Sequence, residues 1–171
     1  MNEIIQNMIT RRSIKKYKPD PVPREMLDQI LKAGTYAACG MGRQSPIIIA
    51  VTDKTVRDEL SALNAKIMGA SGDPFYGAPA VLIVLADKSI PTHVYDGSLV
   101  MGNLMNAAHA LGLGSCWIHR AKETFELPEG KALLNKLGIT GDYEGIGNCI
   151  VGYPAEKKEA KPRKENYIYY T

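Results

Sequence analysis

Cysteine is scarce in this sequence, and its placement argues against two kinds of cysteine-based site. The chain has three cysteines, Cys39, Cys116 and Cys149, and no two of them have the C-x-x-C spacing of a zinc or dithiol motif. We therefore expect no disulfide framework and no metal site, in a reducing compartment such as the cytoplasm. Cys116 and Cys149 lie in apolar, strand-like runs, where a buried and unreactive thiol is the default interpretation.

Long hydrophobic runs are also absent. The longest, residues 78–86, has the length of a strand, whereas a membrane span needs about 18 apolar residues. The N-terminal stretch has neither the apolar core nor the small-residue cleavage site of a secretory signal, and Pro19, Pro21 and Pro23 cut the basic run too short for a mitochondrial transit peptide. We therefore expect a cytoplasmic protein that does not bind membranes.

Side chains that commonly act in catalysis are few. His93 and His109 lie in helical patterns, where packing or surface positions are commoner than ligation, and His119 follows a strand without a suitably spaced serine or aspartate. No pair of acids stands out for general acid–base chemistry. The segment GLGSCW lacks the glycine spacing of a dinucleotide fingerprint, and EGKALL lacks the first glycine of a P-loop. If the protein is an enzyme, we expect a cofactor to supply the chemistry.

Apolar patterns predict a sheet covered by helices. Helical spacing occurs in five segments and strand-like runs occur in four, in the chain order helix 2–9, helix 23–38, strand 46–52, helix 54–68, strand 79–87, helix 95–112, strand 114–119, helix 129–138 and strand 145–154. The helix at 95–112 is apolar almost all round, which indicates burial on most sides. Residues 1–171 are expected to form one domain, with residues 155–171 as a C-terminal arm that ends in a strand-prone, tyrosine-rich stretch.

Positive charge is concentrated at the two ends of the chain. Residues 11–18 hold five cations in eight positions, and the net charge is +4 for residues 1–24, −3 for residues 25–154 and +2 for residues 155–171, or +3 in all. Two basic arms could bind nucleic acid, a basic tail could simply be solvated, or both ends could fold back onto one small anion. The acidic middle and the lack of a basic–aromatic strand pattern argue against nucleic acid.

Five motifs, in the same order, resemble those of the nitroreductase family of FMN flavoproteins. They are RRSIKKY (11–17), AACGMGRQSP (37–46), APAVLIVLAD (78–87), NLMNAAHALGLGSCWI (103–118) and GYPAEKKEAKPRK (152–164). The resemblance implies an α+β sandwich with a central, mostly antiparallel sheet flanked by helices. It also implies an obligate homodimer that builds two FMN sites across its interface and exchanges its C-terminal strands.

The resemblance further implies which residues contact FMN. At the phosphate and the pyrimidine edge of the flavin, the matching positions are Arg11, Arg12, Ser13 and Lys15, together with the C-terminal pair Lys161 and Arg163. Arginine donates to phosphate in a fixed fork and lysine acts as a point charge, so both basic ends of the chain would converge on one anion. The other lysines of these ends, Lys16, Lys18, Lys157 and Lys158, are interpreted as solvent-facing.

At the flavin ring, three further segments match. Cys39, Gly40, Met41, Gly42 and Gln44 match a loop that reaches the ring and ribityl chain from the neighbouring subunit. Asn64 matches a contact to the pyrimidine edge, with an ordinary exposed helical asparagine as the alternative. Trp117, Ile118, His119 and Arg120 match the segment beside flavin N5, and His119 and Arg120 would lie near the substrate; no side chain need act as a nucleophile.

The sequence departs from the family pattern at two places. Gly42 stands where an asparagine is common, and Ser45–Pro46 stands where Pro-Trp is common, which puts the ribityl contact and the local packing in question. His119–Arg120 stands where many relatives have smaller residues, and an arginine beside the reactive ring face could favour anionic substrates.

The implied activity is transfer of hydride and electrons from NAD(P)H through flavin N5 to a nitroaromatic, quinone or similar acceptor by ping-pong chemistry. One alternative is a flavin-binding protein without NAD(P)H turnover, and another is a family branch with different flavin chemistry, such as reductive dehalogenation. The sequence leaves open the physiological acceptor and the choice between NADH and NADPH.

Overall fold

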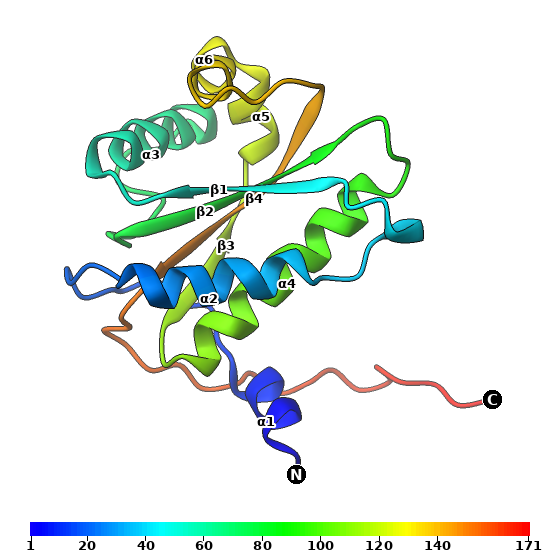
Figure 1. Ribbon diagram of the computed structural model, residues 1–171. Helices are drawn as coiled ribbons and strands as arrows, with labels where there is room; N and C mark the ends of the chain where they lie inside the picture. Colours follow the sequence, from blue (N-terminus) through cyan, green and yellow to red (C-terminus); the bar gives the residue numbers. More distant parts are fainter.

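A single antiparallel sheet organises the structure, a computed structural model that describes all residues from Met1 to Thr171 (Figure 1). Its strands are β1 (Pro46–Val51), β2 (Ala80–Asp87), β3 (Gly114–Ile118) and β4 (Tyr143–Gly152), in the spatial order β1-β2-β4-β3. Every neighbouring pair is antiparallel. The prediction of an α+β sandwich around a mostly antiparallel sheet is confirmed, and each predicted strand is found within two residues of its expected ends.

Helices cover both faces of this sheet. The helices α2 (Arg24–Thr35) and α4 (His93–Ala110) lie against one face, and α3 (Lys54–Met68), α5 (Ala121–Glu126) and α6 (Pro128–Lys136) lie against the other (Figure 1). The helix α1 (Glu3–Thr10) contacts α4 at the edge of the molecule. Five of the six helices were predicted, and α5 was not.

The central strand β2 explains why the sheet needs helices on both sides. Leu82 and Val84 belong to an apolar cluster with α2 and α4, whereas Val81, Ile83 and Leu85 belong to a second cluster with α3 and α5. All five side chains are fully buried. Because both faces are covered, the strand is apolar throughout instead of alternating between apolar and polar residues.

The two basic ends of the chain lie side by side. Ile14 N–H donates to Ser115 O of β3 at 3.0 Å, Lys18 N–H donates to Tyr153 O at 2.9 Å, and Ala155 N–H donates to Lys16 O at 2.9 Å. The segment after α1 therefore bridges the edge strand β3 and the residues that follow β4. This pairing holds the N-terminal and C-terminal cations at one edge of the sheet.

Residues 155–171 form neither helix nor strand within one chain, and from Lys157 onward every residue is exposed (Figure 1). Strand exchange by this segment remains a prediction. No helix of the structure combines the length and the apolar character that crossing a membrane requires.

Candidate functional site

A hollow of about 320 Å³ lies where the two ends of the chain meet. Its walls come from three places: the end of α1 and the residues after it, the turn from α4 into β3, and the segment after β4. The lining residues are Thr10, Arg11, Arg12, Ile14, His109, Gly112, Leu113, Gly114, Ser115, Pro154, Glu156, Lys157, Lys158 and Glu159. Four of these side chains carry a permanent or near-permanent positive charge.

Three polar atoms from residues of this hollow are buried without a hydrogen-bond partner: Arg11 Nη1, Arg12 Nε and Ser115 Oγ. The Arg12 guanidinium is oriented, because its Nη1 donates to Ile9 O at 2.8 Å and to Arg11 O at 2.7 Å. A buried donor without a partner costs about 1–3 kcal/mol. Two arginines with unmatched donors therefore fit a ligand that carries several acceptor oxygens and negative charge, as a phosphate does.

Glu156 ties the C-terminal wall of the hollow to the N-terminal one. Its carboxylate accepts the Lys15 backbone N–H at 2.6 Å and pairs with Lys158 Nζ at 3.0 Å. The hydrogen bond from Lys15, followed by the hydrogen bond and charge of Lys158, holds the pKa of the Glu156 carboxyl below its ordinary value. This acid therefore offsets part of the positive charge and fixes where the tail begins.

Within one chain, the pair of tail cations that lines the hollow differs from the pair that the resemblance implied. Lys157 and Lys158, interpreted as solvent-facing, are exposed but also line the hollow. Lys161 and Arg163 are exposed and are not among the lining residues; the Arg163 guanidinium donates to Lys161 O at 2.8 Å. Ser13 and Lys15 are exposed beside the hollow, and the Lys15 ammonium lies 5.2 Å from the centre of the Tyr76 ring.

The segment predicted to lie along the flavin ring accepts hydrogen bonds from two side-chain amides. Asn64 Nδ2 of α3 donates to His119 O at 2.9 Å, and Asn148 Nδ2 of β4 reaches the same oxygen at 3.3 Å. Asn64 is 1% exposed and its Oδ1 has no partner, so the alternative of an ordinary exposed asparagine is wrong. The structure brings Asn64 to the segment Trp117–Arg120, and its contact with the pyrimidine edge of the flavin remains a prediction.

Arg120 is held in an unusual conformation at the end of this segment. Its backbone has φ of 77°, in the left-handed region that bulky side chains rarely adopt. Its carbonyl accepts the Thr124 hydroxyl at 2.8 Å, and its guanidinium lies 3.5 Å from the Glu123 carboxylate. His119 is exposed beside it, so both side chains can reach a ligand.

The predicted flavin-contacting loop, Cys39–Gln44, contains the short helical turn η1 (Gly40–Gly42). Met41, Gly42 and Gln44 all have positive φ. Gly42 has φ of 65°, a conformation that glycine and asparagine both tolerate, which accounts for glycine where the family commonly has asparagine. Cys39 and Gln44 border a separate hollow beside α2 and β1, so within one chain this loop does not reach the hollow lined by Arg11 and Arg12.

Comparison with known proteins identifies the family. A sequence model described as the Nitroreductase family matches residues 8–158. The chain belongs to the nitroreductase family. The resemblance seen in the five sequence motifs is thereby confirmed.

Individual members of the nitroreductase family agree with this assignment. The chain is 28% identical over 186 residues to an FMN reductase [NAD(P)H] of Bacillus subtilis, an alignment that covers 95% of this chain and 70% of that protein. It is similar to a nitroreductase with bound FMN from Bacteroides fragilis, with a TM-score of 0.91, 26% identity and complete coverage of both chains. An FMN-dependent nitroreductase from Clostridium difficile gives a TM-score of 0.81 and 30% identity, with 97% of this chain and 98% of that chain covered.

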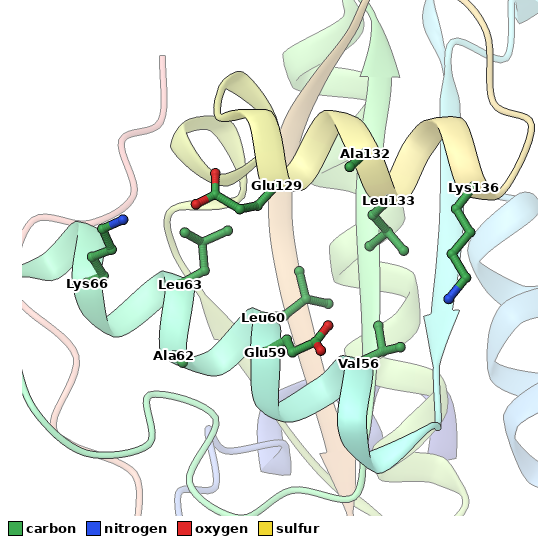
Figure 2. Close-up of a pocket in the computed structure, with 10 residues that line it drawn as sticks. All are labelled: Val56, Glu59, Leu60, Ala62, Leu63, Lys66, Glu129, Ala132, Leu133 and Lys136. Atoms are coloured by element: carbon green, nitrogen blue, oxygen red, sulfur yellow. The ribbon is translucent and has the colours of Figure 1, made fainter.

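A larger hollow, of about 550 Å³, lies between α3 and α6 (Figure 2). Leu60, Leu63 and Leu133 point into it, and four charged residues stand around them: Glu59, Lys66, Glu129 and Lys136. It contains none of the residues that match nitroreductase motifs.

Three residues of the hollow beside Arg11 and Arg12 were not predicted to belong to the site: His109, Lys157 and Lys158. Only their position in the folded chain brings them to this hollow.

Proposed function

We propose that this chain is an FMN-dependent oxidoreductase that takes electrons from NAD(P)H and passes them to a nitroaromatic, quinone or similar acceptor. The observation that carries the proposal is the pair of buried, unmatched donors of Arg11 and Arg12 in the hollow where the two chain ends meet. The family assignment and the named activities of its relatives support the same conclusion.

The residues of the hollow would hold the FMN phosphate. Arg11 and Arg12 would donate to its oxygens, with Lys157 and Lys158 adding charge from the tail. Ser13, Lys15 and Asn64 would contact the pyrimidine edge, and the loop Cys39–Gln44 of the neighbouring subunit would cover the ring and the ribityl chain. The residues present therefore fit the cofactor.

When bound, FMN supplies hydride and electron transfer at its N5, first from NAD(P)H and then to the acceptor, in ping-pong order. The protein's own part is orientation and charge. Asn64 and Asn148 fix the His119 carbonyl, and thereby the backbone from Trp117 to Arg120, whose N–H groups would face the ring. His119 and Arg120 would line the place where donor and acceptor bind.

We further propose that residues 1–171 form one domain that works as a homodimer, with residues 155–171 as an exchanged arm. Two apolar faces favour a partner: Ile4, Ile5, Met8 and Ile9 on α1 are at least half exposed, and Tyr95 and Leu99 on α4 are 72% and 50% exposed. The free edge of β1 and the exposed Tyr167–Tyr170 offer a strand pair. Light scattering of the full chain and of a chain that ends at Lys164 tests this; a monomeric full chain would refute it.

The decisive experiment is the visible absorption spectrum of the purified protein, recorded without oxygen before and after addition of NADH or NADPH. Flavin bands that bleach support an oxidoreductase, and the faster donor is the preferred one. Bands that persist with both donors favour the alternative of a flavin-binding protein without NAD(P)H turnover. A colourless protein that does not take up added FMN would refute the proposal.

A further inference from the structure

His109, in the last turn of α4, lies in the same hollow as Arg11 and Arg12. It is partly buried, and its Nε2 is 3.0 Å from Thr10 Oγ1. The helical pattern around it gave no reason to assign it a ligand. The fold nevertheless places its imidazole beside the two guanidinium groups that have unmatched donors.

The hydrogen bonds of Thr10 fix which ring nitrogen carries the proton in neutral His109. The Thr10 hydroxyl donates its one hydrogen to Gln6 O at 2.7 Å, so it can only accept from the imidazole. Nε2 therefore carries the hydrogen, and Nδ1 carries the lone pair. Nδ1 is the atom that gains a proton when the ring becomes charged.

We propose that His109 is a phosphate-binding residue that takes up a proton when FMN binds, so that FMN affinity rises as the pH falls through neutrality. This inference rests on the proposed function. The neutral ring contributes no charge to the hollow, whereas the imidazolium adds a further cation and a further N–H donor beside the arginines.

The free protein favours the neutral ring. Burial, and then the positive charges of Arg11 and Arg12, hold the pKa of His109 below its ordinary value. A bound phosphate reverses the sign of the local charge and raises that pKa. Because the pKa is higher in the complex than in the free protein, the contribution of His109 to the affinity rises as the pH falls from the bound-state pKa to the free-state pKa, and is constant below the latter.

Other charged groups also face this hollow. They are the cations Arg11, Arg12, Lys157 and Lys158 and the carboxylates Glu156 and Glu159. Side chains of these types ordinarily change charge outside the range from about pH 6.5 to 8.5, which is the range in which histidine responds to a nearby phosphate. The FMN phosphate itself takes up a proton near pH 6, equally for every variant. The difference in pH dependence between the wild-type protein and a His109 variant can therefore be assigned to His109.

The direct test is the NMR titration of the three histidine rings in the full-length protein, alone, with FMN and with riboflavin. Riboflavin has the same ring system and no phosphate. We expect the pKa of His109 to rise by about one unit with FMN and to stay unchanged with riboflavin. The variant His93→Gln identifies one of the other two histidine signals. An FMN complex in which His109 keeps its free-state pKa would overturn the inference.

Affinity measurements provide the matched functional test. FMN binding to the wild-type protein should be about three- to tenfold tighter near pH 6.5 than near pH 8.5, and His109→Gln should remove this difference. His109→Lys, which keeps a cation at every pH tested, should bind FMN equally at both, and the distant His93→Gln should behave as wild type. Riboflavin binding should be the same in all four proteins, which also shows that they are folded.

The outcomes separate the two proposals. If neither flavin binds at any pH, the proposed function itself fails. If FMN binds and His109→Gln retains the wild-type pH dependence, the FMN proposal stands and the role of His109 is refuted.

Discussion

The carboxylate of Asp96 on α4 accepts the backbone N–H of Gly40 at 2.9 Å, across 56 positions of the sequence. The same carboxylate accepts the Ser45 hydroxyl at 2.8 Å and the Thr92 hydroxyl at 3.0 Å. Asp96 is 2% exposed. One buried acid therefore ties both ends of the predicted flavin-contacting loop to the helix behind it.

Asp96→Ala should loosen this loop and lower the free energy of unfolding by about 2–3 kcal/mol, because one buried and two part-buried donors lose their acceptor. FMN should also bind more weakly, since the loop is expected to cover the neighbouring subunit's flavin. Urea unfolding and a flavin titration measure the two effects. Asp28→Asn, which removes only an exposed ion pair with Arg24, is the control and should change neither.

Asp96 also predicts an acid dependence of stability. Burial disfavours its charge, but hydrogen bonds from Gly40, Ser45 and Thr92 outweigh burial and hold the pKa of its carboxyl below the ordinary value. The stability it contributes is therefore present above the ordinary pKa and is lost as the pH falls through the lowered one. Asp96→Asn should be less stable than wild type near neutral pH, and the difference should narrow toward pH 3. A constant difference across the titration would contradict the assignment.

The two pairs of tail cations make competing predictions. Because Lys157 and Lys158 line the hollow within one chain, the double variant with Lys157→Ala and Lys158→Ala should bind FMN about tenfold more weakly. Its affinity for riboflavin should not change. The resemblance assigns the phosphate contact to Lys161 and Arg163, so the same comparison with Lys161→Ala and Arg163→Ala decides whether those residues reach the phosphate in the assembled protein. Loss of riboflavin affinity in either variant would indicate a change of fold instead.

Arg120 is expected to select among acceptors. Its guanidinium is partly exposed and only loosely paired with Glu123, at 3.5 Å, so it can attract an anionic substrate. Arg120→Ala should lower kcat/KM for carboxylated nitroaromatics by about tenfold relative to neutral ones, with the larger share in KM. An unchanged ranking of anionic and neutral acceptors would show that Arg120 plays no part in selection.

Gly147 leaves room for the single tryptophan of the chain. A Cβ at this position would lie 2.7 Å from the Trp117 indole and 3.0 Å from the buried Met101 side chain. Gly147→Ala should therefore destabilise the protein by about 1–3 kcal/mol and shift the fluorescence of Trp117. Gly102→Ala, in a helix and with nothing within 4 Å, should be neutral or stabilising by up to about 1 kcal/mol. Equal effects of the two substitutions would refute this interpretation.

Thiol labelling should distinguish the three cysteines. Burial raises the pKa of Cys149 to about 12, and both Cys149 and Cys116 are buried, whereas Cys39 is partly exposed. In the folded protein iodoacetamide should modify Cys39 alone, and in denaturant it should modify all three, as mass spectrometry would show. Rapid labelling of Cys149 in the folded protein would contradict its burial.

The parts of the fold that could be predicted are those with strong local signals. The helix α3 was predicted with its observed bounds from the helical spacing of its apolar residues. The structure shows what fixes those bounds: Asp53 caps the start, accepting Val56 N–H at 2.9 Å, and Gly69 ends the helix in a left-handed conformation. The helix α5 was missed because six residues are too short to show a helical period, and its place is set by contact of its first turn with β4 at Gly145.

The candidate site likewise has residues that could be predicted from the sequence and residues that could not. Arg11 and Arg12 were found because they stand in one continuous motif. His109 was not, because it reaches the hollow only when the end of α4 packs against Thr10, a contact between residues 99 positions apart. A helical pattern records which face of α4 is apolar, and carries no information about which segment will lie beside that face.

The hollow is assembled from residues 10–14 and residues 154–159, so it needs nearly the whole chain. During synthesis the second of these segments leaves the ribosome long after the first. A nascent polypeptide that lacks residues 154–159 therefore has only part of the wall of the hollow, and the proposed phosphate site is complete only once they are present. A chain that stops before residue 154 would retain Arg11 and Arg12 but could not close the hollow around them.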